Sequence, residues 1–258
     1  VNQIEVSDNF VAGNYGITIT QDARQAIVVG NGAVTMSDTA TVTKEQAGTI
    51  SMNGYGIEIS EGDTLAGIMV KLVDGADKIG GRVFAITAGA TNDTKVNGTD
   101  YAGYEPQTSY AGNNIVFMTK ESGSSKTMNI TCSNAELANM LGIATAATNS
   151  GMYAEGSDVQ AEFTLDNDGK RVGFADSAVI STSGTRVTVK DVNNRTFVTD
   201  VPSNVAGTQF SDTAKADDKS TATSTQTAKV TQEVTDVGTM SVHVGANENQ
   251  VILIDIPA

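Results

Sequence analysis

The sequence predicts a mainly β protein with a small α+β part, organised as two β-rich domains with few short helices. Apolar and polar residues alternate over short stretches along most of the chain, which is the period of a half-buried strand. Apolar residues have helical spacing in only two places, residues 65–73 and 135–141. The 26 glycines, against 3 prolines, suit a chain with many tight turns.

Residues 1–46 predict strands, because Tyr15, Ile17 and Ile19 alternate and residues 26–29 form a short apolar run. A β-β-α-β unit follows over residues 48–86. Two alternating stretches, 50–52 and 57–59, flank an Asn-Gly pair that accepts the positive φ angles of a hairpin turn. One helical stripe then precedes a strand over residues 83–86, and it consists of Leu65, Ile68, Met69, Leu72 and Val73.

Capping residues predict where the two helices begin and end. Asp63 is placed to accept free backbone N–H groups at the start of the first helix, and Gly75 to end it in a left-handed conformation. Ser133 and Glu136 have the spacing of a capping box at the start of the second helix, and Gly142 follows it.

The remaining segments predict strands and loops. Residues 87–112 are polar and glycine-rich, which predicts a surface loop, and two strands follow at 115–120 and 128–132. Alternation from 156 to 165, an Asp-Gly turn and apolar alternation up to residue 201 predict a β meander. Residues 203–233 contain few large apolar groups and predict an exposed connection, whereas 239–256 predict a hairpin.

Charge and composition exclude several classes of partner. Sixteen Lys and Arg against 30 Asp and Glu give a net charge of −14, which repels nucleic acid and anionic membranes. No apolar run approaches the roughly 18 residues that span a bilayer. Cys132 is the single cysteine, so it forms no disulfide within the chain, and its place at a strand end favours a small buried hydrophobic residue over a nucleophile.

The residues needed for catalysis or metal binding are missing or incomplete. His243 is the single histidine, and the chain has neither a His-Glu-x-x-His motif, a Gly-x-Ser-x-Gly elbow nor a phosphate-binding loop. Glu58 and Glu61 form a carboxylate pair without an apolar surrounding in sequence. Asp166 and Asp168 match only a fragment of a calcium loop and suit a hairpin turn better. We therefore predict no enzyme, no catalytic, cofactor-binding or metal-binding residues, and no cofactor.

The 48–86 unit resembles the flagellin hook IN repeat, which occurs in bacterial flagellins and in hook-associated and filament cap proteins. Val73 and Asp74 stand where that repeat usually has Asn. Residues 13–26 resemble the segment before this repeat in filament cap proteins, and 156–165 and 183–191 resemble central strands of both groups. Residues 239–256, with Gly-Ala-Asn-x-x-Gln, resemble a hairpin of the flagellin inner domain. The positions that match the repeat are Ile50, Asn53, Gly54, Ile57, Asp63, Thr64 and Leu65.

The resemblance implies a structural, non-enzymatic subunit of the bacterial flagellar filament: the outer domains of a flagellin, secreted, extracellular and serving motility. Its expected partners are other flagellin subunits. The chain begins at Val1 and lacks the heptad helices of flagellins, so we expect a monomeric segment of a longer protein. The alternative is a filament cap or hook-associated protein, and a more distant one is a secreted adhesin or glycan-binding β domain.

The same resemblance suggests three parts. Residues 1–45 plus 157–235 form a discontinuous β-rich outer domain, residues 46–156 form an inserted α+β domain, and residues 236–258 form a hairpin belonging to the flagellin inner domain.

Overall fold

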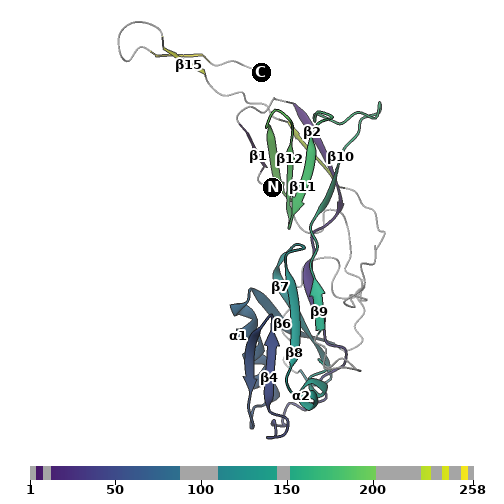
Figure 1. The fold of residues 1–258 in the computed structure, drawn as a ribbon, viewed down its shortest axis with the longest axis vertical. Coiled ribbons are helices and arrows are strands. Elements are labelled where there is room, and N and C mark those ends of the chain that lie inside the picture. Colours follow the sequence, from purple (N-terminus) through teal and green to yellow (C-terminus); the bar gives the residue numbers. More distant parts are fainter. Residues whose placement is uncertain are drawn as a thin grey trace.

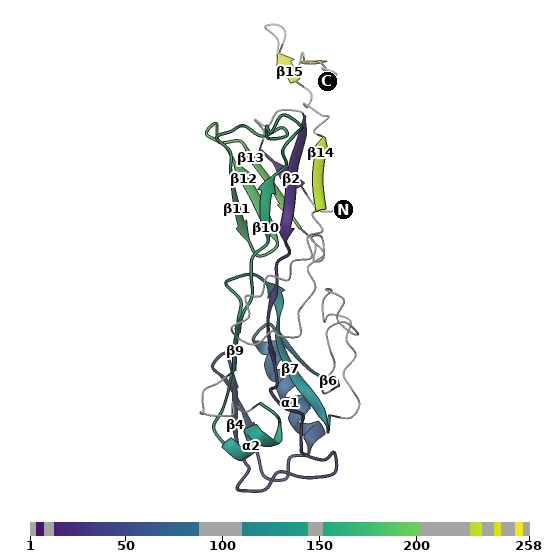
Figure 2. The ribbon, with the colours of Figure 1, turned by 90° about the vertical axis from the view of Figure 1, so that its right-hand side faces the viewer.

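The computed structural model describes residues 4–7, 13–87, 110–143, 152–201, 228–233, 240–243 and 251–254, the last three ranges as backbone only. These residues form two lobes along one long axis (Figures 1 and 2). We call them the helical lobe and the sandwich lobe. The fold is mainly β, with two short helices among the described residues, as the sequence predicts.

The helical lobe holds two antiparallel sheets, of order β3-β7-β6 and β5-β4-β8-β9. Helix α1 packs against β5 and β6. Its strands and helices are β3 (Gln25–Val29), β4 (Gly48–Met52), β5 (Tyr55–Ile59), α1 (Leu65–Lys78), β6 (Gly81–Thr87), β7 (Asn113–Ser122), β8 (Thr127–Cys132), α2 (Ala135–Met140) and β9 (Met152–Glu155).

The β-β-α-β unit forms where the sequence predicts it. Strands β4 and β5 pair in an antiparallel register through the expected turn, in which Asn53 has φ 49° and Gly54 has φ 85°. The predicted stripe of α1 faces the core, because Leu65, Ile68, Met69 and Leu72 are at most 1% exposed. Val73, at the margin of the stripe, is partly buried against the same core.

The predicted caps of α1 are wrong at both ends of the helix. Thr64 is the N-cap, and its side chain accepts a hydrogen bond from the N–H of Gly67. Asp63 instead accepts from the N–H of Ser60 and binds Lys71. Gly75 does not end the helix, which continues to Lys78. It is buried, and a Cβ there would lie 2.3 Å from Cδ1 of Ile57.

The N-cap of the second helix is Asn134, whereas the sequence predicts a capping box of Ser133 and Glu136. The Asn134 side chain accepts from the N–H groups of Glu136 and Leu137. The hydroxyl of Ser133 is engaged elsewhere, because it accepts from the N–H of Thr49 on β4 at 2.8 Å. Gly142 follows the helix with φ 66°, as predicted.

The sandwich lobe packs a sheet of order β1-β13-β12-β11 against one of order β10-β2-β14. The alternating residues of β2, β12 and β13 meet in its core, and Phe174 contacts three other aromatic rings there. Its strands are β1 (Ile4–Val6), β2 (Asn14–Gln21), β10 (Gln160–Phe163), β11 (Val179–Ser183), β12 (Arg186–Lys190), β13 (Thr196–Asp200) and β14 (Ala228–Glu233).

Part of the predicted exposed connection is wrong, because residues 228–233 form β14 and pair with β2. The predicted C-terminal hairpin is confirmed for the backbone: β15 (Met240–His243) pairs with β16 (Val251–Ile254) in an antiparallel register. Most of the predicted loop over residues 87–112 and the connection over 203–227 lie outside the described residues.

The division into domains stays a prediction, but the packing favours a different first boundary. Residues 26–42 contribute five side chains to the buried cluster of the helical lobe: Ala26, Val28, Val34, Met36 and Val42. A boundary near residue 24 therefore fits the packing better than one near residue 45. Among the described helices, none is long and apolar enough to span a membrane.

Candidate functional site: the junction between the lobes

Of the residues considered for chemistry from the sequence, Asp166 has a structural role, and Glu58 and Glu61 lie on the surface. Oδ1 of Asp166 accepts from the N–H groups of Asp168 and Lys170, at 2.9 and 2.8 Å, so this carboxylate closes a turn. Glu58 and Glu61 are exposed, on β5 and in the turn after it. His243 lies on β15, where only the backbone is described.

Cys132 is half-buried at the end of β8. Its thiol donates a hydrogen bond to the carbonyl of Asn134 at 3.2 Å. Burial raises the pKa of this thiol, and backbone hydrogen bonds oppose the shift. A raised pKa keeps the sulfur protonated at neutral pH, and the thiolate is the reactive form. This environment is that of an unreactive thiol, but the side chain is half-buried rather than buried as the sequence predicts.

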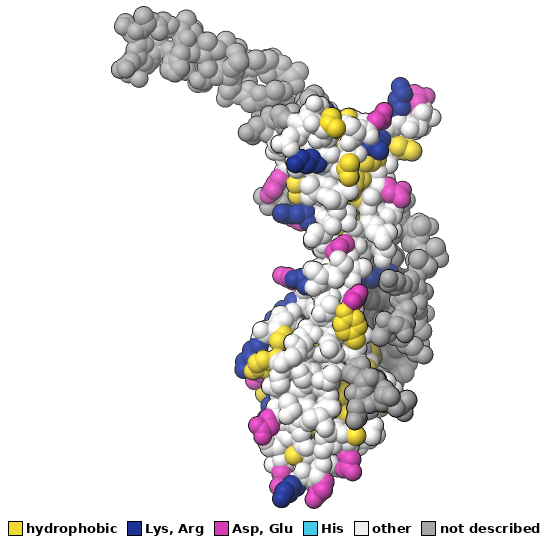
Figure 3. All heavy atoms as spheres, in the orientation of Figure 1, with side chains coloured by type: hydrophobic (Ala, Val, Ile, Leu, Met, Phe, Trp, Pro, Cys, Tyr) yellow, Lys and Arg dark blue, Asp and Glu magenta, His cyan; other side chains and the backbone are white. Residues whose placement is uncertain are grey.

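The described residues hold no candidate metal site. They contain no group of three His, Cys, Asp or Glu side chains placed to hold a metal ion. A surface pocket of the sandwich lobe has about 20 Å³, space for roughly one water molecule. Asp191 in its wall binds Arg195 of the same turn at 2.6 Å. On the face in Figure 3, acidic and basic side chains lie scattered over both lobes.

The most specific polar arrangement lies where the two lobes meet. The described chain crosses between them at residues 22–24 and 156–159, and the two crossings pair with each other. The N–H of Arg24 donates to the carbonyl of Ser157 at 2.8 Å, and the N–H of Ser157 donates back at 3.0 Å. Burial lowers the pKa of Arg24, while the charge of Asp22 opposes that shift.

The tip of the β7–β8 hairpin packs onto this crossing. Gly123 donates to the carbonyl of Arg24 at 3.0 Å, and Gly156 donates to that of Lys126 at 2.9 Å. A Cβ on Gly156 would lie 2.5 Å from the carbonyl oxygens of both Arg24 and Gly123. Because those atoms belong to the backbone, the close approach requires glycine at this position.

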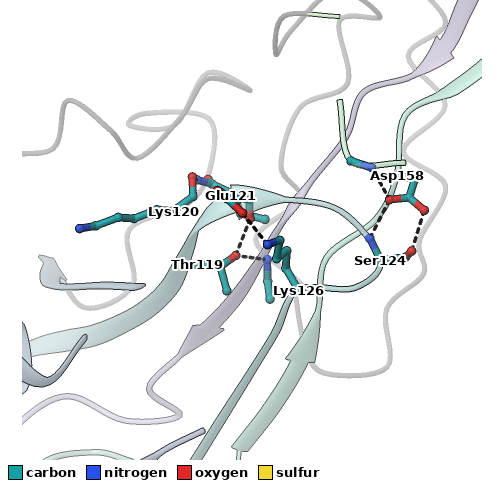
Figure 4. Close-up of polar contacts among 9 residues, drawn as sticks. Thr119, Lys120, Glu121, Ser124, Lys126 and Asp158 are labelled. Carbon is teal, nitrogen blue, oxygen red and sulfur yellow. Dashed lines mark hydrogen bonds and ion pairs between the residues drawn. The ribbon is translucent and has the colours of Figure 1, made fainter. Parts of the chain in front are cut away.

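Side chains at the end of β7 and in the turn after it make further contacts (Figure 4). Oγ1 of Thr119 accepts from the N–H of Ala26 at 3.0 Å and donates to the carbonyl of Glu121 at 2.8 Å. Lys126 forms an ion pair with Glu121 and lowers the pKa of that carboxyl. The hydrogen bond from Ala26 binds the hairpin to β3, and the other two contacts lie within the hairpin.

Asp158 connects the hairpin to the sandwich lobe. Its Oδ1 accepts from the N–H of Ser124 at 2.9 Å and from that of Gly184 at 2.7 Å, and its Oδ2 accepts from the Ser124 hydroxyl at 2.6 Å. The Ser124 hydroxyl is the largest cause of a lowered pKa for Asp158, and the two backbone donors add to it against burial. The ionised carboxylate therefore fits this place well.

Sequence reasoning did not identify the junction as a site. Ser124 lies between the strands predicted at 115–120 and 128–132, and Gly184 lies within the predicted meander. Asp158 lies next to the domain boundary that the sequence predicts between residues 156 and 157. That position was the available signal, but the partners of Asp158 are 26 and 34 residues away.

Comparison with known proteins gives matches among solved structures only, since neither a protein-family model nor a curated protein matches the chain. The flagellar cap protein FliD from Escherichia coli, in a structure of domains D1-D2-D3, is 16% identical with a TM-score of 0.43. This match covers 78% of the present chain and 55% of that one, so the chain spans about half of it.

Two further matches are similar in kind. The D2-D3 domains of FliD from Serratia marcescens are 11% identical, with 78% of this chain and 92% of that chain covered and a TM-score of 0.42. FliD from Bdellovibrio bacteriovorus is 13% identical, with 77% and 96% covered and a TM-score of 0.30. The chain is thus similar to parts of flagellar cap proteins, at low identity.

Proposed function

We propose that the chain is a non-enzymatic, structural part of a bacterial flagellum, outside the cell, and that it belongs to a cap-type or hook-associated protein. One observation carries the proposal: the β4–β5–α1–β6 unit has its turn, its helix and its third strand where the hook IN repeat implies them. The proposal follows the alternative that the sequence offers, a cap or hook-associated protein, in place of a flagellin.

Details of that unit support the resemblance beyond its order of elements. Asn53 does more than form the turn, because its side-chain oxygen accepts from the N–H of Asn129 at 2.7 Å and its amide donates to the carbonyl of Thr127 at 2.8 Å. Thr64 caps the helix. Asn53 and Thr64, which both match the hook IN repeat, therefore make specific hydrogen bonds in this fold.

The choice between the two flagellar classes rests on two phrases of the sequence. Residues 13–26, which resemble filament cap proteins, form β2 and the start of β3 and lead through the junction into the helical lobe. Residues 239–256, which resemble flagellin, form a short hairpin of a common kind. The first phrase is integrated into both lobes, and we give it the greater weight. The FliD structures named above are in line with that choice.

Immunogold electron microscopy of flagellated cells from which the sequence derives would test the proposal. An antibody raised against the purified chain should label the distal filament end for a cap-type protein, or the hook–filament boundary for a hook-associated one. Labelling along the whole filament would restore the flagellin interpretation. Gold that stays away from flagella would overturn the proposal, and specific binding on a glycan array would then favour an adhesin.

We also propose that this chain alone is monomeric in dilute solution and that its partners in the flagellum are other flagellar subunits. Long apolar helices, which would mediate assembly in a coiled coil, are absent from the described residues. Light scattering at several concentrations would measure the mass, and polymer formation would contradict this proposal.

A further inference from the structure

We propose that Asp158 fixes the orientation of the two lobes, so that the chain behaves as one rigid arm. Loss of this carboxylate would convert the junction into a hinge at residues 22–24 and 156–159. The inference rests on the geometry of the junction and does not depend on the flagellar assignment.

A contact that fixes the orientation is needed because few other described contacts join the lobes. The buried clusters of the helical and sandwich lobes share no residue. Two chain crossings and two hairpin turns, β7–β8 and β11–β12, make the described junction. Relative motion is the default for domains joined by a small interface. A fixed orientation therefore needs a specific contact.

Asp158 supplies that contact because its three donors come from both lobes. Ser124 belongs to the β7–β8 hairpin of the helical lobe, and it donates through both its N–H and its hydroxyl. Gly184 belongs to the β11–β12 turn of the sandwich lobe. Figure 4 shows the carboxylate of Asp158 facing Ser124, with the two hydrogen bonds between them as dashed lines. Hydrogen bonds to an ionised acceptor are about twice as strong as neutral ones.

Glycines bring the two hairpin turns close enough for one carboxylate to reach both. A Cβ on Gly123 would lie 3.0 Å from Cα of Gly184, and Gly184 has φ 59°. The N–H of Val159 also donates to the carbonyl of Gly184 at 2.9 Å. The ion pair of Lys126 with Glu121 lies within the helical lobe and does not link the lobes.

Distance measurements between two spin labels would test this proposal. Labels on Val70→Cys in α1 and Val192→Cys in the sandwich lobe use side chains that are 60% and 78% exposed, and Cys132→Ser removes the native thiol. We expect a narrow distance distribution in this parent, a broad one in Asp158→Ala, and an intermediate one in Ser124→Ala.

Asp166→Ala is the matched control. Asp166 also accepts two backbone N–H groups, but within one turn of the sandwich lobe, so its loss should leave the distribution narrow. Equal widths in the parent and Asp158→Ala would overturn the proposal, as would a parent that is already broad or equal broadening in Asp166→Ala. If Asp158→Ala does not fold, Ser124→Ala decides the result, because it keeps the carboxylate and one donor from each lobe.

Discussion

The two lobes solve the same packing problem with different side chains. Among the described residues, the main buried cluster of the helical lobe has 23 members, mostly aliphatic, and one of them is aromatic, Phe117. The sandwich cluster has 10 members, and three of these are Tyr15, Phe174 and Phe197. A small core that relies on a few large rings loses a greater share of its buried surface with each ring. In the helical lobe, the buried surface is divided among many smaller side chains.

The largest effect should therefore come from the sandwich lobe. Phe197 is 1% exposed, and its ring lies edge-on to Phe174 with the centroids 5.7 Å apart. Phe197→Ala should cost about 3–5 kcal/mol and lower the melting temperature of the sandwich lobe in calorimetry. Val192→Ala, at an exposed position in the same lobe, is the control. An equal fall in the melting temperatures of both lobes would show that their cores do not unfold separately.

Leu72→Ala in α1 comes next. This side chain is fully buried, and its loss should cost about 2–5 kcal/mol and affect the helical lobe first. Val70→Ala, on the exposed face of the same helix, should change stability by about 0.5 kcal/mol or less. Thermal melts followed by circular dichroism measure both, and equal melting temperatures would contradict the observed facing of the helix.

Gly75→Ala tests the close contact of α1 with the β4–β5 hairpin. The new methyl group would meet Cδ1 of Ile57 at 2.3 Å and Cε of Met52 at 3.1 Å. Overpacking costs about 1–3 kcal/mol, which exceeds the roughly 0.5–1 kcal/mol that alanine gains over glycine in a helix. Gly67→Ala, two turns earlier and less crowded, should be neutral or stabilising. Urea titrations would separate the two, and two stabilised variants would sink this argument.

The smallest effect concerns the ion pair of Asp63 with Lys71 beside the hairpin. Burial would raise the pKa of Asp63, but hydrogen bonds from Lys71 and Ser60 outweigh it and lower the pKa. A lowered folded-state pKa contributes stability that is present above about pH 4 and is lost as the pH falls through the folded value. Lys71→Ala should thus cost about 1 kcal/mol or less at neutral pH.

Denaturant titrations of the parent and of Lys71→Ala at neutral pH and at about pH 2 would check this, since protonation of Asp63 should remove the difference. A difference that grows in acid would contradict the assigned role of the pair. An unchanged difference would instead show that Lys71 acts chiefly through its other contact, a hydrogen bond to the carbonyl of Glu58 at 3.1 Å.

Much of each lobe could be predicted from local pattern, and the errors arose where a distant partner competed. The alternation of β2 and the stripe of α1 follow from period alone. The caps did not, because Asp63 was engaged by Lys71 and Ser133 by Thr49, leaving the adjacent Thr64 and Asn134 to cap the helices. Local sequence cannot show which of two adjacent capping residues will cap a helix, because the choice depends on those distant partners.

The same reason explains the missed strand and the missed site. Residues 228–233 have weak strand character, and their pairing with β2 joins segments about 210 residues apart in the chain. Asp158 gains its role only when two hairpin turns converge on it. Composition could indicate that residues 203–233 bury little, but it could not indicate which of them a distant strand would recruit.

The pairing of the two chain crossings has a consequence for how such a protein can change over time. Strands β2 and β10 pair directly, with Gln21 opposite Gln160, three residues along each strand from the place where Arg24 meets Ser157. From the side of the sandwich lobe, the helical lobe therefore takes the place of a hairpin loop. A short turn could join the two strands without altering their register, because the inserted segment leaves and returns at adjacent points. Gene rearrangements could then add, lose or exchange the whole helical lobe while the sandwich lobe keeps its pairing.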